Sequence, residues 1–451
     1  MDAIMRLTKR IWLVTLLFWL APRARADVAV LLGEPYSYDG AFAGTGHAAL
    51  YLTRVCAASP TKLRRCEPGE SGVVMSRYHR IAGYDWIAIP LYPYLYAVDR
   101  PEDIPLFADN KLEAALRDQY RRKVLEDVVA DGPSRATPGG DWYELIGSAY
   151  DRTLYGFQIE TTPQQDDEFI ARYNARPNRE SYKLVSRNCA DFVRDAVNFY
   201  YPKAAKRSVI ADLDVSTPKH AAKSVVQFSK RHPELHFTRF AIPQVPGTIR
   251  RSRPPRGLVE SVFKAKKYEL PLLALQPFVA GGFAVAYVAS GRFNPAQHAM
   301  VLAWGGDLEA PLGAQERRAY QKGLAEVTKA TAEENPGREG ASWHHLLARG
   351  RLRLNQEGRP TLEVRSGESV VEVGITRGNV SNFHDGPSRE VLQELLGVRL
   401  REELRGGGAP KASQAEMESD WKLLKMVSAN KLRDVADHAK VAGSAAMGDA
   451  N

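Results

Sequence analysis

Short runs of apolar, β-prone residues follow one another in the first quarter of the chain and predict β-strands. The runs cover residues 28–32, 47–52, 72–79 and 84–90, and loops containing glycine and polar residues separate them. Strands that follow each other through short connections usually pair in the antiparallel direction. The sequence therefore predicts an antiparallel sheet of three or four strands near the N-terminus.

Helical periodicity begins at about residue 110, where apolar side chains recur three and four positions apart. Thr162 stands before Pro163 and Thr217 before Pro218, and a threonine followed by proline is typical of a helix start. Together with the sheet, these helices indicate an α+β fold. The predicted helices cover residues 110–129, 141–154, 162–172, 189–200 and 217–230.

The first 26 residues have the features of a secretory signal peptide. A basic start with Arg6, Lys9 and Arg10 precedes an apolar run at 11–21, and Ala24-Arg25-Ala26 forms a small-x-small cleavage site. The apolar run is too short to span a bilayer comfortably. We expect export and cleavage before Asp27, which would lower the formal net charge from +9 to +5.

Two segments after residue 245 differ from the rest in composition. Residues 246–256 contain three prolines and four arginines, and we interpret them as an exposed linker rather than a basic arm that contacts anionic material. Leu270–Ser290 is free of charged residues and long enough to span a membrane. Its prolines, its glycine pair and its basic flank on the exported side oppose a span. We favour a membrane-contacting segment or a buried apolar hairpin.

The last part of the chain, residues 311–451, is charged and mainly helical and contains no candidate chemistry. Residues 361–375 predict two short strands around Ser366-Gly367-Glu368. A glycine run at 406–408 ends the helical pattern, and the tail after it frays into small residues. The predicted helices cover residues 315–334, 390–403 and about 421–436.

The three cysteines are informative if the protein is exported. Cys56 and Cys66 are close enough in sequence to form a small disulfide in an oxidising compartment. Cys189 is then left without a partner, as an intermolecular link or a reactive thiol. A Cys56–Cys189 disulfide would exclude a catalytic role for Cys189.

Cys189 lies where a strand-like run at 182–185 gives way to an amphipathic helix. Asn188 is a good N-cap residue, which places Cys189 in the first helical turn. The positive end of the helix dipole favours the thiolate, which is the nucleophilic form of the side chain. A buried structural cysteine is the alternative.

Thiol catalysis also needs an imidazole that acts as base and acid, and a polar group that orients it. His47 follows Gly46 at the start of a predicted strand, and we choose it as the base. His79 ends the next strand-like run and is the leading candidate for the orienting group, with Ser76 and Asp85 as alternatives.

Other site chemistries have little support in the sequence. His232 and His236, or the His344-His345 pair, lack cysteine or acidic partners at the spacing of a metal site, so we predict no metal and no cofactor. Basic patches with interleaved aromatic residues are missing too, and we predict no nucleic-acid binding.

The order of these motifs resembles that of the circularly permuted papain-like superfamily. Gly46-His47 enters a strand, and Asn188-Cys189-Ala190-Asp191-Phe192-Val193 opens a helix well over a hundred residues later. The superfamily includes NlpC-type envelope peptidases and amidases and the lecithin retinol acyltransferase-like proteins. The resemblance implies a sheet packed on the cysteine-bearing helix. It also implies that His79 is the third polar residue of the site, which orients the histidine base. It covers about residues 27–240 and leaves insertions between His47 and His79 and at 100–180 unmatched.

We therefore expect an exported cysteine hydrolase that cleaves amide bonds in cell-envelope peptide in the periplasm. Cys189 would attack, His47 would act as base and acid, and His79 would orient His47. A lipid acyltransferase or deacylase with the same thiol, held at a membrane by Leu270–Ser290, is the second hypothesis, and an inactive envelope-binding module is the third. The expected domains are a signal peptide at 1–26, a papain-like catalytic domain at 27–245, a linker with the apolar segment at 246–310, and a C-terminal α+β region at 311–451.

Overall fold

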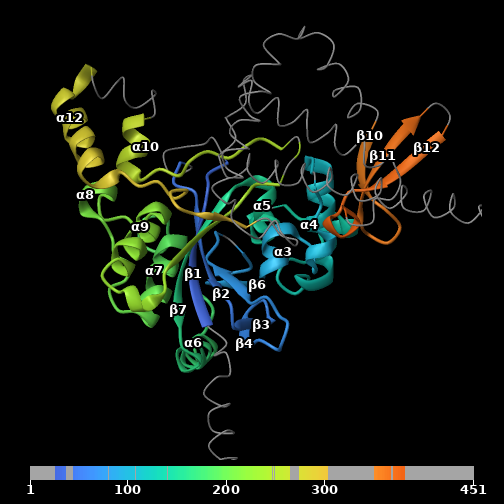
Figure 1. Ribbon diagram of the computed structural model, residues 1–451, viewed down its shortest axis with the longest axis horizontal. Helices are drawn as coiled ribbons and strands as arrows, with labels where there is room; N and C mark the ends of the chain where they lie inside the picture. Colours follow the sequence, from blue (N-terminus) through green and yellow to red (C-terminus); the bar gives the residue numbers. More distant parts are fainter. Residues whose placement is uncertain are drawn as a thin grey trace, which may run out of the picture.

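A seven-stranded, mostly antiparallel sheet forms the centre of the molecule (Figure 1). The computed structural model describes residues 26–36, 44–79, 81–106, 108–139, 141–245, 247, 249–264, 274–302, 350–366 and 369–380. Only the last pair of the sheet, β8 and β9, is parallel. Its strands, in spatial order, are β6 (Ile87–Pro90), β5 (Val73–Ser76), β2 (His47–Leu52), β1 (Ala26–Gly33), β7 (Leu154–Thr161), β8 (Thr238–Ile242) and β9 (Met300–Val301).

Both faces of this sheet are buried. Along β1, Val28, Val30 and Leu32 belong to one apolar cluster, whereas Ala29 and Leu31 belong to the other. Successive side chains of a strand point to opposite faces, so the central strand serves two cores. The first face is covered by α6 (Pro163–Ala175), α7 (Cys189–Tyr200) and α9 (Pro218–Ser229), and the second by α3 (Leu91–Tyr96), α4 (Asn110–Val124) and α5 (Ser148–Asp151) (Figure 1).

The antiparallel N-terminal strands and four of the five helices predicted before residue 245 are confirmed, as is the α+β class. Thr162 and Thr217 cap their helices through hydrogen bonds to backbone N–H groups in the first turn. The single helix predicted for residues 141–154 is wrong. This segment forms a 3-10 turn (Asp141–Leu145) and the short α5, and it ends at β7, a strand that the sequence analysis missed.

The cysteine pairing is as expected. Cys56 and Cys66 form a disulfide with a Cα–Cα distance of 4.9 Å, and Cys189 is a free, buried thiol. The disulfide crosslinks a two-stranded hairpin formed by β3 (Val55–Ser59) and β4 (Lys62–Arg65). Cys189 is therefore available for chemistry.

Part of the segment interpreted as an exposed linker is buried against the sheet. Arg251 donates a hydrogen bond to the Gln244 carbonyl at 3.1 Å, and the Ser252 hydroxyl donates to Glu34 at 2.6 Å. The guanidinium donates to backbone carbonyls just after β8, and these hydrogen bonds replace the ones that it would make to water. The interpretation of the whole segment as solvated was wrong at these positions.

The apolar segment at 270–290 is described from residue 274 onward. It forms α12 (Pro277–Ala286) and one π-helical turn (Tyr287–Gly291), near α8 (Val209–Asp212) and α10 (Leu258–Lys264) (Figure 1). Its side chains are mostly exposed, with Phe278 at 95%, so these residues do not form a buried hairpin. Within the described residues, no helix combines the length and apolar character that a membrane crossing requires.

A separate three-stranded sheet packs beside α4 and comprises β10 (Gly350–Leu354), β11 (Pro360–Ser366) and β12 (Ser369–Gly374), followed by α15 (Arg377–Val380). The last two strands confirm the pair predicted within residues 361–375. The predicted helices at 315–334, 390–403 and 421–436, the histidine pair at 344–345 and the signal peptide, except for its last residue, lie outside the described residues.

Candidate active site

Cys189 is the first residue of α7, and the helix start is held by a reciprocal capping box. The Asn188 side chain accepts a hydrogen bond from the Asp191 N–H at 3.0 Å, and the Asp191 carboxylate accepts one from the Asn188 N–H at 3.2 Å. The run before it is not a strand; a turn closed by a bridge between Lys183 and Arg187 leads into the helix. Two otherwise unpaired N–H groups are satisfied in this way, which fixes the position of the thiol.

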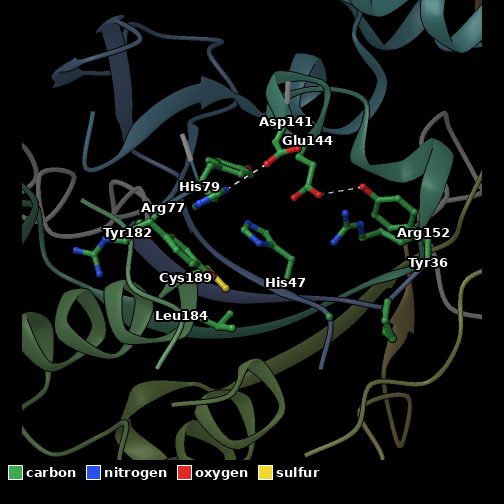
Figure 2. Close-up of a pocket in the computed structure, with 13 residues that line it drawn as sticks. Tyr36, His47, Arg77, His79, Asp141, Glu144, Arg152, Tyr182, Leu184 and Cys189 are labelled. Carbon is green, nitrogen blue, oxygen red and sulfur yellow. Dashed lines mark hydrogen bonds and ion pairs between the residues drawn. The ribbon is translucent and has the colours of Figure 1, made fainter. Parts of the chain in front are cut away.

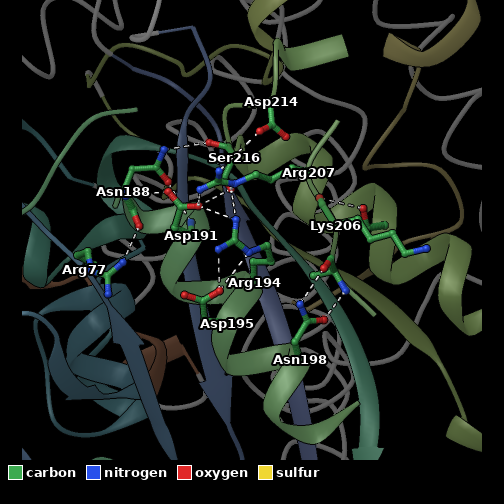
Figure 3. Close-up of polar contacts among 12 residues, drawn as sticks. Arg77, Asn188, Asp191, Arg194, Asp195, Asn198, Lys206, Arg207, Asp214 and Ser216 are labelled. Carbon is green, nitrogen blue, oxygen red and sulfur yellow. Dashed lines mark hydrogen bonds and ion pairs between the residues drawn. The ribbon is translucent and has the colours of Figure 1, made fainter. Parts of the chain in front are cut away.

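Asp191 anchors this helix start to the following loop (Figure 3). One carboxylate oxygen accepts hydrogen bonds from the Ser216 hydroxyl at 2.5 Å, from Arg207 at 2.7 Å and from Arg194 at 2.8 Å. Burial raises the pKa of Asp191, but the hydrogen bonds from Ser216 and Arg207 outweigh it and hold the pKa below its usual value. The carboxylate is therefore ionised and rigid beneath the cysteine.

His47 is the first residue of β2, and the glycine before it lets the chain enter the strand. Gly46 has φ +74°, and a Cβ there would lie 2.1 Å from the Gly33 carbonyl oxygen of β1. His47 pairs with Gly33 in the register of these strands, and its ring stacks on Tyr78 at 4.8 Å between centroids. The imidazole is thus fixed from the backbone and from one face.

Ser76, the last residue of β5, determines the tautomer of His47. Its hydroxyl oxygen lies 2.7 Å from His47 Nε2 and also 2.7 Å from the Ala48 carbonyl oxygen. A carbonyl only accepts hydrogen bonds, so the single hydroxyl proton goes to Ala48 and the serine oxygen accepts from His47 Nε2–H. The other ring nitrogen, Nδ1, is then left as the basic one.

Ser76 occupies the place expected of His79. The side chain of His79 is 47% exposed, its Nδ1 lies 3.5 Å from Asp141, and its ring contacts Tyr182. Strand β5 ends at Ser76, so His79 lies beyond the register in which β5 runs beside β2. Asp85, the other alternative, is paired with Arg77 at 2.7 Å and with Arg187 at 2.8 Å.

The thiol and the imidazole share one pocket of about 440 Å³ (Figure 2). Cys189 enters it from α7 and His47 from β2. The backbone N–H groups of Ala48, Ala190 and Cys189 lie where they favour the thiolate form of the sulfur. Ala48 directly follows His47 in β2. The sulfur therefore lies against the strand that carries the base.

Both partners are uncharged in this pocket. Burial raises the pKa of Cys189 to about 11, although the nearby backbone N–H groups oppose this shift. Burial and the positive charge of Arg152 lower the pKa of His47 to about 3. At neutral pH the pair is a thiol beside a neutral imidazole, so any thiolate would form as the base removes its proton.

Further side chains that line the pocket and were missed by the sequence analysis include Tyr36, Glu144, Arg152 and Tyr182. Burial raises the pKa of Tyr182, which keeps its phenol protonated. Tyr36 donates a hydrogen bond to Glu144 at 3.1 Å. They come from loops and short helical turns, where no periodic pattern marks them.

Comparisons with known proteins add little to this geometry. No family model matches the chain, and no curated protein matches it. A solved structure that matches is the crystal structure of a type VI secretion system effector, TseH, with 16% sequence identity and a TM-score of 0.24. The match covers 49% of this chain and 94% of that chain. Similarity at this level transfers neither an activity nor a site residue.

Proposed function

We propose that the protein is a cysteine hydrolase that cleaves amide bonds in cell-envelope peptide after export to the periplasm. The observation that carries the proposal is the hydrogen bond between Ser76 and His47 Nε2, which leaves Nδ1 as a base in the pocket of Cys189. A base, a thiol and an orienting acceptor together form the constellation that thiol hydrolysis requires. Ser76 replaces His79 as the orienting residue in this proposal.

The reaction proceeds through an acyl-enzyme. His47 Nδ1 takes the thiol proton as the sulfur attacks the amide carbon, and the carbonyl oxygen becomes an oxyanion held by the Cys189 backbone N–H and the Tyr182 hydroxyl. The C–N bond then breaks, and the leaving amine takes the proton from His47. Water attacks the thioester, His47 removes a proton from this water, and the acid is released as the sulfur regains its proton from His47.

The experiment is incubation of the protein with purified peptidoglycan fragments, followed by mass spectrometry of the products. We expect new amine and carboxylate ends with the wild type and none with Cys189→Ala or His47→Ala, both of which should remain folded. Full activity in Cys189→Ala would refute the proposal.

A lipid acyltransferase or deacylase that uses the same thiol is the second candidate function. The exposed apolar side chains of α12, such as Phe278 and Val285, favour it because they suit contact with a lipid surface. Parallel incubation with phospholipid vesicles distinguishes the two, since release of fatty acid dependent on Cys189 would favour this candidate. An inactive envelope-binding module is expected to cleave neither substrate.

A further inference from the structure

Arg152 is a buried cation that no internal group neutralises by direct contact. It follows α5, its exposed fraction is 5%, and its Nε has no hydrogen-bond partner. Among the described residues, the guanidinium group forms no ion pair and donates no hydrogen bond. Burial of an uncompensated charge is costly, so the position calls for an explanation.

Other deeply buried arginines of this protein are paired with acids. Arg121 contacts Asp118 and Asp131, and Arg117 contacts Glu113 and Asp151 at 2.6 Å. Arg77 is paired with Asp85 in the wall of the pocket itself. The fold thus supplies carboxylates to these three arginines and backbone carbonyls to the buried Arg251, and Arg152 differs from all four.

The surroundings of Arg152 hold its side chain extended into the pocket. Its aliphatic part crosses β1 at Gly33, where a Cβ would lie 2.8 Å from the Arg152 Cδ. The guanidinium stacks on the ring of Tyr36, with its carbon 4.3 Å from the ring centroid. Figure 2 shows its nitrogen atoms directed into the pocket, with His47 between Arg152 and Cys189 in this view. One face of the cation is covered, and its edge is left for a ligand.

We propose that Arg152 binds a carboxylate group of the substrate, beside the amide bond that Cys189 attacks. The placement next to the scissile bond rests on the proposed function. A guanidinium edge matches the two oxygens of a carboxylate and donates two parallel hydrogen bonds to them. The substrate class is therefore an amide that carries a free carboxylate close to the reacting carbonyl.

The charges of the pocket favour a carboxylate over a phosphate group. Glu144 and Asp141 line the same pocket, and Asp141 lies within 3.5 Å of His79. A dianionic phosphate at Arg152 would be repelled by both acids, whereas a monoanion has half the charge to be repelled. A phosphate monoester is accordingly the less suitable ligand.

Binding of matched small probes tests the proposal without turnover. The full chain carrying Cys189→Ser is titrated with N-acetylglycine, N-acetylglycinamide and inorganic phosphate at constant ionic strength, with saturation-transfer NMR as the readout. We expect the carboxylate to bind on the order of tenfold more tightly than the amide, since a hydrogen bond to a charged group is worth more than a neutral one. Adding Arg152→Met should abolish this preference.

Arg172→Met is the matched control, because Arg172 also stacks on an aromatic ring, Phe199 at 5.3 Å, but lies outside the pocket lining. The preference should survive this change. Arg152→Lys and Glu144→Gln provide further tests if Arg152→Met does not fold: the first should weaken the preference, and the second should strengthen it by removing a repelling charge.

Equal binding of the two N-acetyl probes, a preference that survives Arg152→Met, or tighter binding of phosphate than of N-acetylglycine would overturn the proposal. These outcomes are independent of hydrolysis. Hydrolysis that depends on Cys189 without carboxylate preference would leave the proposed function standing, and carboxylate preference without hydrolysis would remove only the proposed function.

Discussion

The neutral state of His47 predicts a specific acid sensitivity of the fold. Burial and the charge of Arg152 lower the pKa of the ring to about 3, against 6.5 in the unfolded chain. Between these values the unfolded state binds a proton that the folded state does not, so stability falls as the pH falls. Between pH 7.5 and pH 4.5 this contribution amounts to about 2.5 kcal/mol.

The assay compares urea unfolding of the wild type and of His47→Gln at these two pH values, followed by tryptophan fluorescence. Relative to His47→Gln, the wild type should lose about 2.5 kcal/mol on acidification. Burial also raises the pKa of Glu113 to about 8 and of Asp166 to about 6, but both titrate equally in the two proteins and cancel in the difference. With Arg152→Met in both proteins the loss should shrink, because one cause of the lowered pKa is gone. A difference in stability that does not change with pH would refute the neutral state of the ring.

Three further substitutions test the support of the site. Ser76→Ala should lower kcat for the amide substrate by about 10- to 100-fold with little change in KM, because the His47 tautomer is no longer held; unchanged kcat would contradict the assignment. Tyr182→Phe should lower kcat by about tenfold or more and leave alkylation of the thiol by iodoacetamide unchanged, and a loss in alkylation alone would argue against an oxyanion role. Asp191→Asn should reduce the free energy of unfolding by about 3 kcal/mol in urea titrations. Asp195→Asn, which removes an exposed carboxylate bound to the same arginine, should cost far less, and equal losses would show that burial of Asp191 contributes nothing.

The parts of the fold with strong periodicity could be predicted from the sequence. The helix at Cys189 was predicted with its bounds and its Asn188 cap, since apolar spacing and capping chemistry are local properties. The disulfide could be predicted from the short separation of Cys56 and Cys66 together with the expectation of export. The pairing of His47 with the cysteine helix required the motif order as well.

The missed features depend on contacts between distant segments. Strand β7 carries Gly156, against which the Phe240 ring of β8 packs so closely that a Cβ would lie 2.0 Å from it, and a glycine weakens a strand pattern. Ser76 was ranked below His79 because His79 was taken as the end of the strand-like run, whereas the register of β5 on β2 decides which side chain reaches His47. Arg152 follows a four-residue helix, and only the folded pocket distinguishes it from a surface arginine.

The most direct test of the central claim is detection of the acyl-enzyme on Cys189. The protein is mixed with peptidoglycan fragments, quenched in acid within seconds and analysed by intact-mass and peptide mass spectrometry. The account predicts a substrate-derived acyl adduct on the peptide that contains Cys189, accumulating when water attack is slowed and missing in Cys189→Ala. Substrate cleavage that leaves Cys189 unmodified at every time point and persists in Cys189→Ala would contradict it.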